Sequence, residues 1–120
     1  MLEIEELNHV AIYVKNVEVS SEFYKSILCL SPLPRPDFNF PGAWFRLGSR
    51  QELHLIGNRA EDLIFHKRHH FALKIRSASA AEQWLKEKEV AFAGPKPRPD
   101  GAIQIFLQDP DGYYIELFEL

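Results

Sequence analysis

The chain consists of two copies of one sequence pattern, and this repeat constrains its fold more than any other feature. The segment Asn8–Lys15 (NHVAIYVK) returns as His69–Arg76 (HHFALKIR), and the motif Pro34–Asp37 (PRPD) returns as Pro97–Asp100. One long internal repeat predicts two copies of a supersecondary unit, packed about an approximate twofold axis. At 120 residues with 46% hydrophobic content, the chain is long enough for one globular domain, residues 1–120, with an apolar core.

The first half predicts a strand, a helix and two further strands. Residues 7–14 alternate in polarity and are rich in Val, Ile and Tyr, which favours a strand. Asn16 can cap a helix that runs to about Leu28. Because it holds four prolines, the segment Ser31–Pro41 is expected to be an ordered loop without regular structure. Residues 44–47 and 52–56 are the remaining predicted strands, joined by a turn at 48–51.

The second half repeats this order. Ser79 and Glu82 match the capping box, with Ser79 as the cap of the second helix. Val90–Phe92 predicts a short strand and Pro95–Gly101 a proline-rich loop. The other predicted strands are residues 69–76, 103–107 and 113–118, the last two joined by the turn signal Asp109–Gly112. The two modules are expected to span about 5–57 and 68–119, with a linker at 58–67.

Composition excludes several classes of protein. The net charge of -3 and the absence of a basic stripe argue against nucleic acid as a partner. Residues 1–6 are acidic and lack an apolar core, so no signal peptide is expected, and no apolar run approaches the ~20 residues that cross a membrane. The single Cys29 cannot form an internal disulfide, and its apolar, helical-looking surroundings predict a buried thiol. We therefore expect a cytoplasmic protein.

Four candidate metal ligands occupy equivalent places in the two halves. His9 corresponds to His70 in the repeat, and His54 corresponds to Glu116. Because side chains alternate between the two faces of a strand, each lies opposite the apolar stripe that packs under the helix, whereas the adjacent His69 points away. Four strands related by a twofold axis could aim these four side chains at one point.

Three imidazoles and one carboxylate form a ligand set that suits Zn, Ni, Fe, Co or Mn better than Ca or Mg. A divalent ion there would polarise a carbonyl or enediolate oxygen, or acidify a bound water. Taken singly, each histidine is more often a hydrogen-bonded structural residue, and Glu116 an ordinary surface acid. Four such residues at repeat-equivalent positions, all on the same face, favour a site for one divalent transition metal.

The chain resembles the vicinal oxygen chelate superfamily, which includes glyoxalase I, the bleomycin and fosfomycin resistance proteins, methylmalonyl-CoA epimerase and extradiol dioxygenases. The resemblance extends over essentially the whole chain and rests on Asn8–Ala11 (NHVA), Ser21–Tyr24 (SEFY), His70–Leu73 (HFAL) and, most specifically, Asp109–Leu117 (DPDGYYIEL). It implies an α+β fold in which two tandem βαβββ modules form a curved, cup-like mixed sheet around a metal. The positions that face the metal correspond to His9, His54, His70 and Glu116. In many members the cup is assembled across a homodimer, and a homodimer is expected here.

The resemblance implies a metal-dependent, glyoxalase-like lyase or isomerase that acts on a small oxygenated substrate, with Glu116 moving a proton. Two alternatives remain open. An Fe(II) dioxygenase of the extradiol type would use His9, His70 and Glu116 as ligands, with His54 as an acid or base. A non-catalytic binder of the bleomycin-resistance type would lack the metal and would line an aromatic groove with Phe38, Phe40, Trp44 and Phe45.

Five further residues are candidates for substrate binding. Asn58 matches the glutathione-contacting Asn of glyoxalase I, but Tyr13 stands where that enzyme tends to have a carboxylate-binding Arg, which argues against glutathione. Arg35 and Arg98 occupy matched proline-rich loops and could clamp an anionic substrate, although solvated loop charges are equally common. Trp44 belongs to a segment that resembles glyoxalase-like proteins of plants and bacteria.

Overall fold

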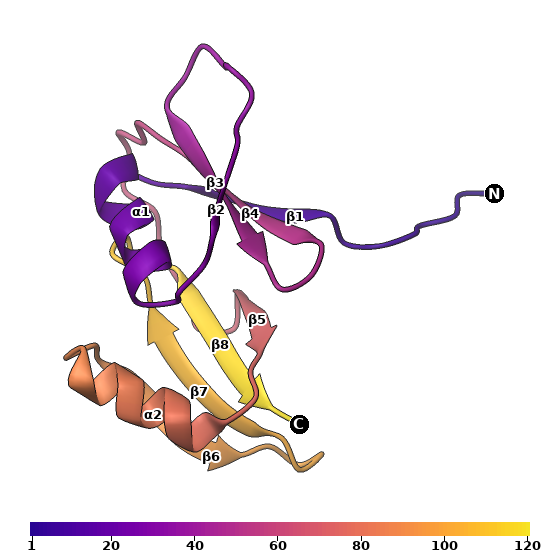
Figure 1. Ribbon diagram of the computed structural model, residues 1–120, viewed down its shortest axis with the longest axis vertical. Helices are drawn as coiled ribbons and strands as arrows, with labels where there is room; N and C mark the ends of the chain where they lie inside the picture. Colours follow the sequence, from indigo (N-terminus) through magenta and orange to yellow (C-terminus); the bar gives the residue numbers. More distant parts are fainter. The chain divides into compact units, whose positions relative to one another are not determined.

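The computed structural model describes residues 1–120, which divide into two compact units, Met1–Asp62 and Leu63–Leu120. Each unit combines one helix with one sheet (Figure 1). The first unit contains β1 (His9–Tyr13), α1 (Val17–Ser26), β2 (Pro32–Leu33), β3 (Gly42–Leu47) and β4 (Gln51–Ile56). The second contains β5 (His70–Lys74), α2 (Ala78–Glu87), β6 (Phe92–Pro97), β7 (Ile103–Gln108) and β8 (Tyr114–Glu119).

The two sheets have the same topology. The strand order is β1-β4-β3-β2 in the first unit and β5-β8-β7-β6 in the second. In each sheet the first strand along the chain pairs in parallel with the last, β1 with β4 and β5 with β8, and the other neighbours are antiparallel. Each unit is therefore one strand, one helix and three strands of an open mixed sheet, which confirms the predicted α+β fold built from two βαβββ modules.

Alternation along the strands separates the core from the candidate ligands, as predicted. In β1, Ile12 is buried whereas His9 is exposed. In β4, Leu53 and Leu55 are buried on either side of the partly exposed His54. Since the apolar residues share the face that packs under the helix, the polar ones share the opposite face.

The helix boundaries differ from the prediction in two places. Ser77, not Ser79, caps α2: its backbone is extended and its Oγ accepts from the amide of Ala80 at 3.1 Å. Both serines precede small residues, so the local pattern does not reveal which one leaves the helical conformation. Cys29 is exposed rather than buried, because α1 ends at Ser26 and Cys29 lies beyond it with a φ of 58°. Neither helix is long and apolar enough to span a membrane.

Both proline-rich segments contain strand structure where a loop was predicted. Pro32–Leu33 pairs with β3 at one edge of the first sheet, and β6 spans Phe92–Pro97 instead of Val90–Phe92. The register of β6 shifts between Ala93 and Lys96. Proline lacks an N–H group and is tolerated at sheet edges and bulges, which is where these prolines lie.

Candidate functional site

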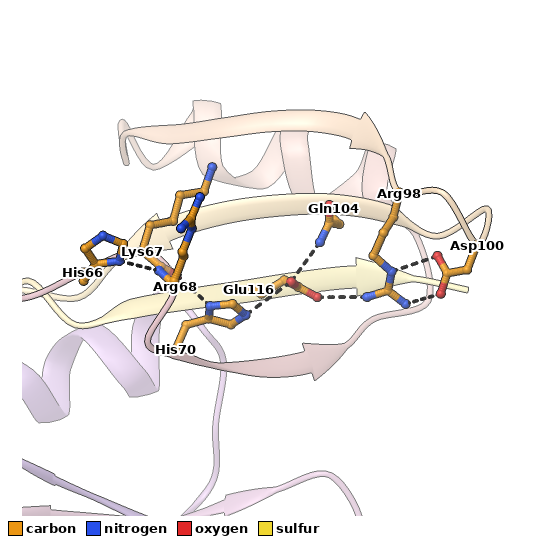
Figure 2. A network of polar contacts seen from close by, with 8 residues as sticks. All are labelled: His66, Lys67, Arg68, His70, Arg98, Asp100, Gln104 and Glu116. Atoms are coloured by element: carbon orange, nitrogen blue, oxygen red, sulfur yellow. Dashed lines mark hydrogen bonds and ion pairs between the residues drawn. The ribbon is translucent and has the colours of Figure 1, made fainter.

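His70 and Glu116 face each other on the second sheet (Figure 2). His70 begins β5 and Glu116 lies in the neighbouring β8, where its register partner is Ala72. His70 and Ala72 are two residues apart and so project from the same face as Glu116. The Nε2 atom of His70 lies 3.5 Å from Oε1 of Glu116. The structure thus brings two of the four predicted ligands together.

The contact at Nδ1 determines which nitrogen of the neutral His70 ring carries the hydrogen. Nδ1 lies 2.7 Å from the carbonyl oxygen of Lys67. A carbonyl oxygen can only accept, so Nδ1 carries the hydrogen. In the neutral ring Nε2 then presents a lone pair to the carboxylate of Glu116. Two electron-pair donors facing each other need a positive species between them, either a proton or a metal ion.

The carboxylate of Glu116 is buried, with 6% of its side chain exposed, and each of its oxygens accepts a hydrogen bond. Gln104 donates to Oε1 at 2.9 Å, and Nη1 of Arg98 donates to Oε2 at 3.3 Å. Gln104 and Glu116 thus meet across β7 and β8, on the face that also carries His70 (Figure 2). These contacts fix the orientation of the carboxylate and direct Oε1 toward His70.

Arg98 is itself held by a second carboxylate. Nε and Nη2 of Arg98 donate to the two oxygens of Asp100 at 2.8 and 2.6 Å. These hydrogen bonds lower the pKa of Asp100 to about 2, and they raise the pKa of Arg98. The guanidinium that was a candidate for clamping an anionic substrate is therefore bound to two carboxylates of its own unit.

One aromatic ring borders the His70–Glu116 pair. Phe106 is the register partner of Glu116 and packs edge to face against the His70 ring, with centroids 5.2 Å apart. The ammonium of Lys67 lies 4.5 Å from the centre of the Phe106 ring. Lys67 therefore contacts His70 directly through its carbonyl oxygen, and its ammonium contacts Phe106, the ring that packs on His70.

In the first unit, His9 and His54 form a stack of rings with Trp44. The His54 ring lies 4.1 Å from His9 at an interplanar angle of 15°, and 4.0 Å from Trp44 at 4°. On the ring edge, Nε2 of His54 lies 2.9 Å from Oε1 of Glu52. In His9, Nδ1 lies 2.8 Å from Oδ1 of Asn8, so its Nε2 keeps a lone pair, as in His70.

Each unit therefore holds two of the four predicted ligands. Neither unit by itself gathers three or more His, Cys, Asp or Glu side chains in an arrangement that could hold a metal. His69, predicted to point away from the ligands, makes only a backbone hydrogen bond to His66.

The remaining candidates lie in the first unit, apart from Arg98. Tyr13 is 37% exposed at the end of β1, and the exposed Asn58 has a φ of 63°. The guanidinium of Arg35 lies over the rings of Phe38 and Phe40, at 4.7 and 4.9 Å, and donates to the Phe40 carbonyl. Among the candidates of the first unit, Trp44 contacts a predicted ligand, His54. The role of all these residues in substrate binding stays a prediction.

Sequence reasoning missed the residues that hold the ligands in place: Glu52, Lys67, Asp100 and Gln104. For two of them, Glu52 and Asp100, the sequence contains a pattern that indicates their position. Glu52 lies two positions before His54 on the same strand, and therefore on the same face. Asp100 follows Arg98 at the same short spacing within the repeated motif. Gln104 and Lys67 come close to Glu116 and His70 only through strand pairing and a turn.

Comparison with known proteins identifies the family. The family described as the Glyoxalase/Bleomycin resistance protein/Dioxygenase superfamily matches residues 6–117. The chain belongs to this superfamily. It is 31% identical to Glyoxylase I 4 of Arabidopsis thaliana, over 97% of this chain and 71% of that protein. It is also 31% identical to the metallothiol transferase FosB of Staphylococcus epidermidis, over 97% of this chain and 82% of that protein.

A solved structure from the same superfamily, a glyoxalase family protein of Bacillus anthracis, superposes on this chain with a TM-score of 0.85 at 25% identity. The superposition covers 99% of this chain and 98% of that one. The superfamily fold therefore extends over the whole chain.

The segment that most specifically resembles the superfamily has a structural explanation. Oδ1 of Asp109, a buried side chain, accepts from the amides of Asp111, Gly112 and Tyr113 at 2.9, 3.0 and 2.9 Å. Gly112 has a φ of 114°, which a residue with a Cβ rarely adopts. This turn starts β8 at a fixed position and so sets which residue, Glu116, faces His70.

Proposed function

We propose that this protein is a divalent-metal-dependent, glyoxalase-like lyase or isomerase that acts on a small oxygenated substrate. His9, His70 and Glu116 would hold the ion, with His54 as a fourth ligand. The observation that carries the proposal is the His70–Glu116 pair, in which a lone pair and a carboxylate oxygen face each other at 3.5 Å. The similarity to Glyoxylase I 4 and to a metallothiol transferase supports a metal-dependent reaction.

The spacing of this pair fits two ligands of one ion. Zinc-to-nitrogen and zinc-to-oxygen bonds are about 2.1 Å long, so two neighbouring ligands in a tetrahedral site lie about 3.4 Å apart. The separation of 3.5 Å between Nε2 and Oε1 agrees with this value. The hydrogen bonds to Lys67 and Gln104 behind the two ligands are the outer contacts that commonly orient metal-binding side chains.

His54 fits the proposed metal site less directly than His70 and Glu116 do. Its Nε2 is bonded to Glu52, which leaves Nδ1 as its metal-binding atom. Because the rings of His9 and His54 are stacked nearly parallel, a single ion cannot lie in both ring planes. One of the rings has to rotate before both bind the same ion. We therefore expect His9, His70 and Glu116 to contribute most of the affinity.

When bound, a divalent ion supplies Lewis acidity, which stabilises negative charge on a substrate oxygen. The chain supplies the group that moves the proton. If Glu116 leaves the ion during the reaction, its Oε1 can accept and return a proton as a general base. Its orientation is held by Arg98 at Oε2 and by Gln104 at Oε1, so the carboxylate is positioned before the substrate arrives.

The first test is elemental analysis of untagged protein purified without chelators, expressed as metal per chain. We expect about one equivalent of Zn, Ni, Co or Mn. His70→Ala should empty the site, while the matched variant His69→Ala should retain the metal. Full retention of metal by His70→Ala would remove that ligand from the proposal. Glu116→Gln should reduce turnover far more than it reduces metal affinity.

The same measurement tests two other functions. A metal content that is mostly iron and is lost on exposure to air would support the Fe(II) dioxygenase. Absence of metal, even after reconstitution, would support a non-catalytic binder. For the binder, the specific observation is that Phe38 and Phe40 are 43% and 40% exposed and stack on each other, with Trp44 nearby.

A further inference from the structure

Two cations of the second unit, Lys67 and Arg68, lie near the His70–Glu116 pair without a carboxylate partner. Apart from the backbone, the only contact of Lys67 is the one with the Phe106 ring, and Arg68 uses only its amide, which donates to Nδ1 of His66 at 3.0 Å. Figure 2 shows both side chains on the opposite side of Glu116 from Arg98. Their charges are therefore available to a ligand.

Phe106 places the Lys67 ammonium on the face that carries Glu116. Phe106 and Glu116 are register partners on antiparallel strands, so their side chains project from the same face. The ring also contacts His70, and the ammonium lies 4.5 Å from the ring centre. A cation held over an aromatic ring keeps N–H groups free on the side away from the ring. Lys67 can thus donate to a molecule bound at the pair.

Arg98, on the other side of the pair, cannot take this role as readily. Three of its N–H groups are bound to carboxylates, two bonds going to Asp100 and one to Glu116. The charges of Arg98 and Asp100 offset each other. The two positive charges of a divalent ion outweigh the one negative charge of Glu116. Lys67 and Arg68 add further positive charge, so the site with its metal bound is strongly positive. A ligand with negative charge beyond its metal-binding oxygens would complement it.

We propose that Lys67, with Arg68 beside it, binds an anionic group of the substrate. The substrate class is then a metal-chelating oxygenated compound that carries an additional carboxylate, phosphate or sulfonate. This inference rests on the proposed function, because it takes the His70–Glu116 pair as part of the metal site. It assigns the anion subsite to the turn before β5 instead of to the proline-rich loop of Arg98.

The test compares two probes that share one chelating group and differ by one charge. Butyrohydroxamate is neutral at its far end, and succinic acid monohydroxamate carries a carboxylate there. Each is titrated by calorimetry into full-length protein loaded with Co(II), and the visible cobalt bands report whether the probe reaches the metal. We expect the carboxylated probe to bind more tightly to the native protein.

In Lys67→Met this preference should fall about fivefold, while the Kd of butyrohydroxamate stays within about twofold. Lys67→Arg should retain the preference. Lys88→Met is the matched control, because Lys88 also lies over an aromatic ring, Trp84, at 4.7 Å, but contacts no candidate ligand. Melting temperatures of all variants show whether each one is folded.

Two results would overturn the inference while leaving the proposed function intact. One is equal affinity of the two probes for the native protein, with both shifting the cobalt bands. The other is an undiminished preference in a folded Lys67→Met variant. If neither probe shifts the bands, or if the protein binds no cobalt, the proposed metal function has failed and this inference fails with it.

Discussion

Gln104 donates from Nε2 to Oε1 of Glu116 at 2.9 Å, the same oxygen that lies 3.5 Å from Nε2 of His70. The amide thus directs one particular oxygen toward the imidazole. Arg98 occupies the other oxygen. The two contacts distinguish the oxygens of Glu116, so that one is anchored and the other is directed toward the site.

Gln104→Leu should therefore weaken metal binding without changing the charge of the site. We expect a loss of about tenfold in affinity for Zn or Co, the size usually seen when an outer hydrogen bond to a ligand is removed. Competition with a chromophoric chelator measures it. Gln83→Leu, the same change on the exposed side of α2, is the control. Equal affinities for the two variants would show that Gln104 does not position Glu116.

The Arg98–Asp100 pair should stabilise the folded protein at neutral pH and lose this effect in acid. The pKa of Asp100 lies at about 2 in the folded protein, below its ordinary value of 3.8, because Arg98 donates to the carboxylate. A lowered pKa means that this stability is fully present above about pH 4 and is lost as the pH falls toward 2. Asp100→Asn should therefore melt below the native protein at pH 6, and the difference should shrink between pH 4 and pH 2. A difference that persists at pH 2 would contradict the assignment.

Trp44→Leu should release the His54 ring. Stacked aromatic pairs contribute about 0.5–1.5 kcal/mol beyond their burial, so we expect a modest loss of stability. The sharper measurement is the NMR shift of the His54 C2 proton, which the Trp44 ring at 4.0 Å should displace from its ordinary position. The variant should move this signal toward that of a free histidine. Phe38→Leu, which changes an aromatic residue that contacts Trp44 but not His54, should leave it in place.

Ser77→Ala should destabilise the second unit by about 1 kcal/mol, because Ser77 Oγ accepts from the first turn of α2 at 3.1 Å. Ser79→Ala should cost less than about 0.5 kcal/mol, since Ser79 contacts only the Ser77 hydroxyl. Urea unfolding of the two variants side by side measures the difference. A larger cost for Ser79→Ala would contradict the assignment of the cap.

Much of the fold could be predicted from local patterns because those patterns report burial. Alternation along β1 and β4 placed Ile12 and Leu53 in the core and left His9 and His54 on the opposite face. The capping signal at Asn16 is confirmed by its bond to the Val19 amide at 3.0 Å. Prolines misled the prediction at Pro32–Leu33, because a missing N–H excludes a residue from the middle of a sheet but not from its edge.

The sequence by itself determined which residues share a face, since that depends only on the period of a strand and on the repeat of the two halves. It could not determine what each polar atom contacts. The bond of His70 to the Lys67 carbonyl, the capture of Arg98 by Asp100 and Glu116, and the stacking of His54 on Trp44 each depend on distances between chain segments. Those distances follow from strand register and loop conformation. The tertiary structure alone therefore decided which nitrogen of His70 faces Glu116 and which cations remain available to a substrate.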